Sequence, residues 1–221
     1  MNIKRLLATC AFLIALAWTG AVHANVIYTV SLNTGAISGA AGYALAFSFT
    51  DGSLVGDSNN TVTLDNFNFG VGGSATGSPV LSGGGSGSIG SSVTLSDSDF
   101  LNTLAEGFTP GASLSFNVNL TTNVDAGFTP DFFGFSLLKD GISLPTQDDT
   151  LGDNLLYFNI DSDNPAQAVF ATAAGSPVTL DAPTVTLASP NGQVPEPGSL
   201  ILLMAGLAGL FGVRRRGAKQ Q

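Results

Sequence analysis

The sequence holds very few of the side chains on which most enzyme active sites depend. Its 221 residues include one cysteine, one histidine and one tryptophan, and Cys10, Trp18 and His23 all lie near the N-terminus. Residues 25–194 therefore contain no thiol, no imidazole and no arginine. This excludes a disulfide, a cysteine or histidine catalytic group and an arginine clamp from that segment.

Positive charge is equally scarce. The basic residues lie almost entirely at the two ends of the chain, and Lys139 is the only one in residues 25–194. The same segment holds 15 acidic residues, all aspartate except Glu106, and so has a net charge of −14. Nucleic acid is not expected as a partner, because this segment has almost no side chains that neutralise phosphates. A charge of this size favours solubility in crowded surroundings.

The first 24 residues have the three regions of a secretory signal peptide. Lys4-Arg5 forms a positive n-region, residues 6–18 form an apolar core, and Val22-His23-Ala24 supplies a small-residue cleavage site. We expect the general secretion machinery to export the chain and signal peptidase to cut it between Ala24 and Asn25.

The C-terminal segment also has three parts. Pro195-Glu196-Pro197 breaks any strand or helix, because each proline fixes φ and lacks an N–H donor. Residues 199–213 carry no charge and predict an apolar helix. At about 1.5 Å per residue, residues 200–213 reach about 21 Å, which spans a bilayer only if the bilayer thins. The positive-inside rule then places Arg214, Arg215 and Arg216 in the cytoplasm.

This order of a Pro-Glu-Pro element, an apolar helix and a terminal arginine cluster resembles the PEP-CTERM sorting signal. The resemblance implies an exported protein of an exopolysaccharide-producing Gram-negative bacterium. It also implies a partner, a membrane-embedded exosortase that recognises and cleaves at Pro195-Glu196-Pro197. The helix would anchor the chain in the inner membrane until that cut, and the body would then reach the cell surface or extracellular matrix. The resemblance indicates where the protein is sorted and does not say what the exported domain does.

Residues 25–187 show the alternation of a β protein. In residues 114–120, Leu114, Phe116, Val118 and Leu120 alternate with polar residues and so share one face. Short strands with turns between them predict one antiparallel β-sandwich, jelly-roll-like, with a Phe-rich core. Residues 188–194 are then a linker to the sorting signal at 195–221. Further strands are predicted at residues 26–32, 45–49, 62–69, 89–95, 133–138, 155–160, 168–172 and 178–187.

Several local features refine this prediction. Asp51-Gly52 predicts a hairpin turn, and a change of parity predicts a bulge near Asp65-Asn66. Residues 97–106 predict a short helical turn with Asp97 or Ser98 as its N-cap. The Gly/Ser-rich residues 70–91 predict long loops around one weak strand. Gly-Phe-Thr-Pro occurs at 107–110 and again at 127–130, which predicts a duplicated turn into a strand, with a repeated ligand loop as the alternative.

Aspartate clusters provide the candidate metal ligands. Asp161, Asp163 and Asn164 bring oxygen-bearing side chains together as calcium loops do, and a second group lies in residues 148–153 (Asp148, Asp149 and Asp153). The glycine and glutamate of an EF-hand loop are missing. Aspartate and asparagine also build ordinary turns by bonding to their own backbone. We therefore expect no cofactor, with calcium at the Asp161 loop as the alternative.

No catalytic residues are predicted. An aspartate pair acting on a glycan would have neither tryptophan nor arginine to hold the sugar. A carbohydrate platform needs exposed aromatic rings, and Tyr28 and Tyr43 are expected in the core, which leaves Tyr157. We expect a non-enzymatic structural or adhesive protein associated with exopolysaccharide and biofilm. The alternative is a calcium-dependent polysaccharide-binding module.

Overall fold

The computed structural model describes residues 25–52, 56–123, 129–148, 152–162 and 164–188. The predicted cleavage site at Ala24, Asp163, Pro195-Glu196-Pro197, the helix at 199–213 and the arginines Arg214, Arg215 and Arg216 lie outside these residues. Within them, one 3₁₀ turn, η1 (Gly35–Ile37), accompanies the strands. No helix in these ranges has the length and apolar character needed to cross a membrane.

The strands follow one another through the whole described body. In chain order they are β1 (Asn25–Asn33), β2 (Tyr43–Thr50), β3 (Thr61–Asn68), β4 (Ser74–Ser82), β5 (Gly84–Gly87), β6 (Val93–Ser96), β7 (Leu101–Thr109), β8 (Ser113–Thr121), β9 (Asp131–Lys139), β10 (Ile142–Ser143), β11 (Leu156–Ile160), β12 (Ala166–Val169) and β13 (Thr184–Leu187).

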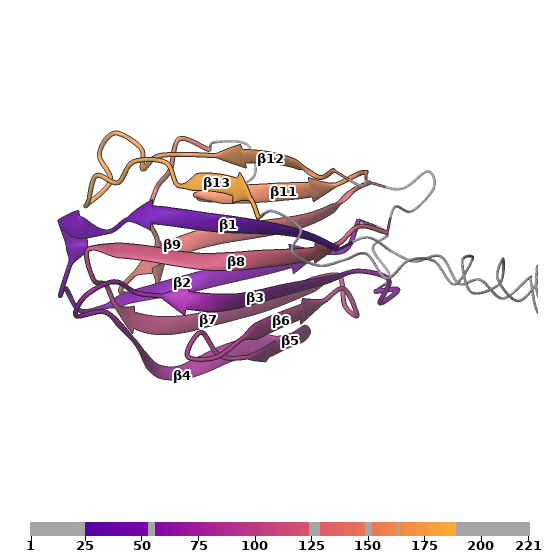
Figure 1. The fold of residues 1–221 in the computed structure, drawn as a ribbon, viewed down its shortest axis with the longest axis horizontal. Coiled ribbons are helices and arrows are strands. Elements are labelled where there is room, and N and C mark those ends of the chain that lie inside the picture. The colour runs from indigo at the N-terminus through magenta and orange to yellow at the C-terminus, as the bar shows by residue number, and fades with distance from the viewer. Residues whose placement is uncertain (1–24, 53–55, 124–128, 149–151, 163, 189–221) are drawn as a thin grey trace, which may run out of the picture. The chain divides into compact units, whose positions relative to one another are not determined.

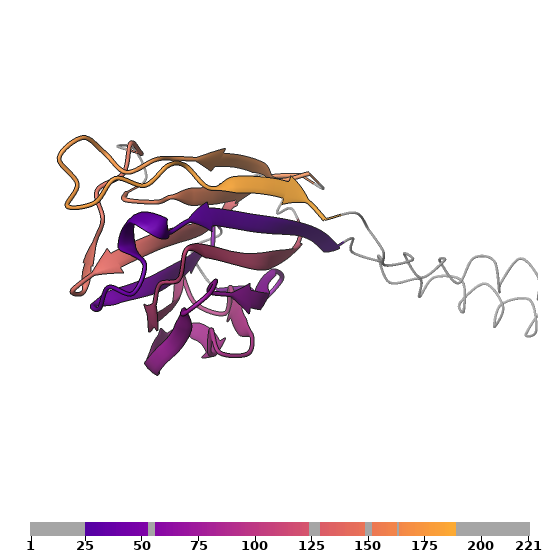
Figure 2. The same ribbon diagram turned by 60° about the vertical axis from the view of Figure 1, so that its left-hand side comes forward.

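These strands form two antiparallel sheets, one behind the other (Figures 1 and 2). The six-stranded sheet has the order β13-β1-β8-β3-β6-β5, and the seven-stranded sheet has the order β12-β11-β9-β2-β7-β4 with β10 paired to β9. Every pairing between them is antiparallel, which confirms the predicted all-β, antiparallel class.

The core lies between the inward faces of the two sheets. Phe116 in β8 is 1% exposed, and its ring centroid lies 5.6 Å from that of Phe47 and 5.2 Å from that of Phe135 in the opposite sheet. The predicted Phe-rich core is confirmed. All buried hydrophobic residues of the described body lie between Tyr28 and Leu180, inside one compact unit of residues 23–189. Because it contains its own core, we expect the body to fold without the terminal segments.

The prediction of a hairpin turn at Asp51-Gly52 is wrong. These residues follow β2, and the next strand, β3, belongs to the other sheet, so the chain crosses between sheets here. Asp51 is buried, and its Oδ2 accepts a hydrogen bond from the backbone N–H of Gly56 at 2.5 Å. A Cβ at Gly52 would clash with the carbonyl of Thr129. Asp51 and Gly52 therefore do not form a two-residue hairpin loop. They lie where the chain leaves β2 and passes close to the backbone of Thr129, which requires a residue without a side chain.

The predicted helical turn at residues 97–106 is also wrong. The segment leads into β7, which pairs with both β2 and β4. Asn102, Leu104, Glu106 and Phe108 alternate on its buried face. The two polar residues among them hid the alternation in the sequence, and pairing on both sides overrides local propensity.

Residues 70–91 contain two strands, β4 and β5, where one weak strand was predicted. Both are edge strands. The register of β4 against β7 shifts between Thr76 and Val80, next to Pro79, and an edge strand tolerates such an interruption. The bulge predicted near Asp65-Asn66 is confirmed, because the β3–β8 register shifts there and Asn66 has a φ of 54°.

Other predicted strands are present with different limits. β6, β12 and β13 are shorter than the runs at 89–95, 168–172 and 178–187 from which they were predicted. The first Gly-Phe-Thr-Pro copy ends β7, and Pro130 of the second directly precedes β9, so each proline stands before a new strand. Gly127 and Phe128 lie outside the described residues.

Candidate functional site

Several strands of both sheets begin or end on the right in Figure 1. Five polar residues stand at or next to such strand ends and are joined by hydrogen bonds. Asp51 follows β2 and Asp131 begins β9, both in the seven-stranded sheet. Asn60 precedes β3, Asp97 follows β6 and Asn123 follows β8, all in the six-stranded sheet. We call these five residues the acidic end. All except Asn123 are buried.

Asn60 connects the members of the acidic end. Its backbone N–H donates to Asp97 Oδ2 at 2.8 Å, and its Nδ2 donates to Asp131 Oδ2 at 2.7 Å. Nδ2 also lies 2.7 Å from the carbonyl oxygen of Asn123, whose N–H donates to Asn60 Oδ1 at 2.8 Å. The other Asp131 oxygen accepts the N–H of Gly52 at 2.8 Å. One asparagine thus holds carboxylates from both sheets.

Asp97 is the least compensated carboxylate of the acidic end. Its side chain is fully buried, and its Oδ1 accepts no hydrogen bond from any residue that the structure describes. Burial, together with the negative charges of Asp131, Asp57 and Asp51, raises the pKa of Asp97 to about 7, although the hydrogen bond from Asn60 acts in the opposite direction. The carboxylate therefore sits where its charged form is disfavoured.

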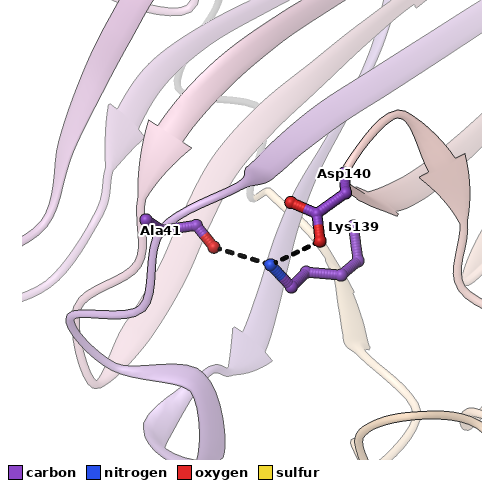
Figure 3. A network of polar contacts seen from close by, with 3 residues as sticks. All are labelled: Ala41, Lys139 and Asp140. Atoms are coloured by element: carbon purple, nitrogen blue, oxygen red, sulfur yellow. Dashed lines mark hydrogen bonds and ion pairs between the residues drawn. The ribbon is translucent and has the colours of Figure 1, made fainter.

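Lys139, the only basic residue of the body, is bound elsewhere. It ends β9, the strand that Asp131 begins, so about 26 Å of extended chain separates the two residues. Its Nζ lies 2.9 Å from Asp140 Oδ2 and donates to the carbonyl of Ala41 at 3.0 Å (Figure 3). The same atom lies 5.2 Å from the centre of the Tyr43 ring. Lys139 therefore does not neutralise the acidic end.

The acidic end was not predicted from the sequence. Asp51 was assigned to a hairpin and Asp97 to a helix cap, and Asp131 was not singled out. The available signal was positional, since each of these aspartates stands directly at the end of a strand. Only the strand order shows that these strand ends meet, and the strand order could not be predicted from the sequence.

Asp161 and Asn164, predicted as ligands of the alternative calcium site, are both exposed. Ser162 Oγ lies 3.1 Å from Asp161 Oδ1 and 3.0 Å from the carbonyl of Asn164, and the N–H of Asn164 lies 3.4 Å from the same Oγ. These are contacts within a turn. Asp163 lies outside the described residues, so calcium binding here stays a prediction.

The second predicted group is divided between turn contacts. Asp148 is buried and its Oδ2 lies 3.4 Å from Asn154 Nδ2, while Asp153 Oδ1 lies 3.3 Å from the N–H of Thr146. Asp149 lies outside the described residues. Across the parts of the chain that the structure describes, no three acidic, histidine or cysteine side chains are grouped so that they could hold a metal ion together.

Two of the three tyrosines lie where the sequence predicts. Tyr28 and Tyr43 are buried in the core. Tyr157 is half-buried, with its ring centroid 5.3 Å from that of Phe132 and 5.7 Å from that of Phe170. A groove of about 470 Å³ lies beside edge strand β12, and Asn164 and Gln167 are part of its lining. Its lining is completed by Tyr28, Pro165, Ala166 and Leu187.

Comparison with known proteins identifies the C-terminal segment. Residues 193–216 match the model of the PEP-CTERM protein-sorting motif. The match includes Pro195-Glu196-Pro197, the apolar run and the arginine cluster, and so confirms the resemblance seen in the sequence. No curated protein and no solved structure matches the chain. The motif supports export, transient anchoring in a membrane and processing by an exosortase.

Proposed function

We propose that this exported exosortase substrate is a non-enzymatic structural or adhesive protein of the cell surface or extracellular matrix of a Gram-negative bacterium, associated with exopolysaccharide and biofilm. The sorting motif at residues 193–216 carries the proposal, because such a motif directs the body out of the cytoplasm. The composition supports it, since residues 25–194 have no cysteine, histidine or arginine and a charge that favours solubility.

The test follows the chain in an exosortase-bearing host and in the same host without its exosortase. In the first, intact mass should show a surface form that begins at Asn25 and lacks residues 200–221. In the second, the tail should be retained and the protein should stay in the inner-membrane fraction. Glu196→Ala should impair processing, and Asn191→Ala, just before the matched motif, should not. A surface form that keeps its tail in the exosortase-bearing host would reduce the motif to a simple anchor.

The matrix role has its own measurement. A strain without this protein should retain less exopolysaccharide in its matrix than the parent strain does. Expression of the full chain should restore retention. A chain that ends at residue 194, added to the culture medium, should restore it only if the body itself binds the matrix. Equal retention in the parent and deletion strains would contradict the structural role.

A calcium-dependent polysaccharide-binding module is the second candidate. One observation favours it: Asn164 belongs both to the Asp161 loop and to the lining of the groove beside β12. The amides of Asn164 and Gln167 can donate to and accept from sugar hydroxyls, and Tyr28 contributes apolar surface. A glycan array of residues 25–194 should then show binding that Gln167→Ala weakens and that Thr94→Ala, on the other sheet, leaves unchanged.

A further inference from the structure

We infer that the outer face of the seven-stranded sheet binds a neutral polysaccharide through the rings of Phe132, Tyr157 and Phe170. The inference rests on the association with exopolysaccharide proposed above, and adds to it the surface and the class of glycan. The place is different from the groove beside β12, and the binding needs no calcium ion.

Three aromatic side chains lie next to one another on this face. Phe132 is in β9, Tyr157 is in β11, and Phe170 directly follows β12. The centroid of the Tyr157 ring lies 5.3 Å from that of Phe132 and 5.7 Å from that of Phe170. Leu156 and Phe158 are fully buried in the core, so Tyr157 between them points to the outward face. All three rings are half-buried and so remain partly accessible. We call them the aromatic strip.

The aromatic strip runs diagonally across the sheet to one of its edges. Phe132 pairs with Asn159 in β11, two residues along that strand from Tyr157. On the other side of Tyr157, the N–H of Phe170 donates to the carbonyl of Leu155 at 2.9 Å. β12 is the edge strand of this sheet. A long chain that lies along the strip can therefore continue past the edge of the protein, which suits a polymer.

Hydrogen-bonding side chains accompany the aromatic strip. Gly134 pairs with Tyr157 on one side and with Ser48 in β2 on the other. A Cβ at Gly134 would meet Ser48 Oγ at 2.9 Å and the ring of Phe132 at 3.2 Å, so this hydroxyl and this ring lie close together. No hydrogen bond among the described residues uses the Ser48 hydroxyl or the Asn159 side chain. Both groups can therefore donate to and accept from the hydroxyls of a sugar.

The outer face carries no charge, although the body is strongly acidic. In β2, at the centre of the sheet, the outward residues are Ala44, Ala46, Ser48 and Thr50. The outward positions of β7, β9 and β11 are likewise uncharged. The charged residues of these three strands, Glu106, Asp131 and Lys139, all stand at positions of the opposite parity. The net charge of −14 of residues 25–194 thus leaves this face free of charged side chains.

The charge of the body favours one kind of occupant. A second copy would bring another net charge of −14 against the first, and an anionic polysaccharide would be repelled in the same way. A neutral glycan is not repelled and has no charge that must lose its water. Sugar rings offer apolar C–H surfaces to aromatic rings and hydroxyls to serine and asparagine side chains. A neutral polysaccharide therefore matches both components of this face.

The experiment measures how far polysaccharides retard the purified exported body, residues 25–194, in native gels that contain EDTA. The gels hold hydroxyethyl cellulose, galactomannan or dextran as neutral polysaccharides, or alginate as an anionic one at matched ionic strength, and a non-binding protein serves as the reference. At least one neutral polysaccharide should retard the body, and alginate should not. No retardation by any of the three, or equal retardation by alginate, would overturn the inference.

Substitutions locate the binding surface. Tyr157→Leu removes the middle ring but keeps an apolar side chain, so the affinity should fall about tenfold. Phe100→Leu makes a matched change at an exposed ring outside the aromatic strip and should leave the affinity unchanged. If Tyr157→Leu does not melt cooperatively, Phe132→Leu tests the same surface. Equal losses in Tyr157→Leu and Phe100→Leu would overturn the inference. A loss in Gln167→Ala alone would move the ligand to the groove beside β12 and also overturn it.

Sedimentation equilibrium tests the other occupant of the face. The body should be a monomer, and a dimer that Tyr157→Leu dissociates would assign the face to a second copy and overturn the inference. These results are separate from those of the deletion strain. Equal exopolysaccharide retention there would contradict the matrix role and leave the gel result unchanged, whereas a failed gel experiment would leave the retention result unchanged.

Discussion

The buried carboxylates at the two ends of the sheets differ in the hydrogen-bond donors that surround them. Toward the Lys139 end lies Glu106, which pairs in register with Leu45, two residues from the Tyr43 that pairs with Lys139. Both oxygens of Glu106 have donors, Ser88 Oγ at 2.8 Å and the N–H of Ile89 at 2.7 Å. At the acidic end, Asp97 is buried as deeply but has a donor for one oxygen only.

This difference shows that burial alone does not make a carboxylate unusual. Glu106 acts as a structural acceptor that fixes the 88–92 loop over β7, and its hydrogen bonds offset the cost of burial. Asp97 lacks one of those bonds, and the negative charges of Asp131, Asp57 and Asp51 raise its pKa further. The substitutions below should therefore act with opposite sign at the two places, and their order follows the expected size of the effect.

The largest effect should be the dependence of stability on pH. The pKa of Asp97 is about 7 in the folded protein, above the value of about 3.9 for an unfolded aspartate. Between these values the folded state binds the proton more tightly, so the free energy of unfolding should fall as pH rises from 4 to 7. The share of Asp97 is about 2–4 kcal/mol. Urea unfolding of residues 25–194 in EDTA measures it.

The matched variants isolate that share. Asp97→Asn should flatten the slope between pH 4 and 7 and raise stability at pH 8, because the unfavourable charge is gone. Asp99→Asn should leave the slope as it is in wild type. If both variants change the slope equally, general repulsion in an acidic body explains it, and the contrast between the two ends disappears.

A smaller effect of opposite sign is expected at Glu106. Glu106→Gln keeps the size of the side chain but replaces an accepting oxygen by a donor and removes the charge from two charge-assisted hydrogen bonds. We expect a loss of about 1 kcal/mol in the free energy of unfolding at pH 8. Equilibrium urea curves for this variant and for Asp97→Asn should shift in opposite directions. A stabilising Glu106→Gln would show that both carboxylates are equally strained.

Much of the fold could be predicted from the sequence, and little of the acidic end could. In strands such as β8, apolar and polar residues alternate without interruption, so the residues of the buried face can be identified from the sequence. β7 was missed because Asn102 and Glu106 occupy inward positions for hydrogen-bonding reasons that only its neighbours explain. Asp51 and Asp131 are distant in sequence, and Gly52 of the β2–β3 crossing connects them. That contact depends on which strands lie side by side.

The smallest effect should come from Lys139. Its ion pair with Asp140 is partly open to solvent, with side-chain exposures of 32% and 69%, and such pairs contribute about 0–1 kcal/mol. Lys139→Met keeps an apolar chain beside Tyr43 and should cost less than 1 kcal/mol, shrinking further in 1 M salt. The distance of about 26 Å to Asp131 exceeds the Debye length of about 10 Å at 0.1 M salt. The dependence of the free energy of unfolding on pH that is due to Asp97 should therefore be the same in wild type and Lys139→Met. A different dependence in the variant would show that the charge of Lys139 affects the protonation of Asp97.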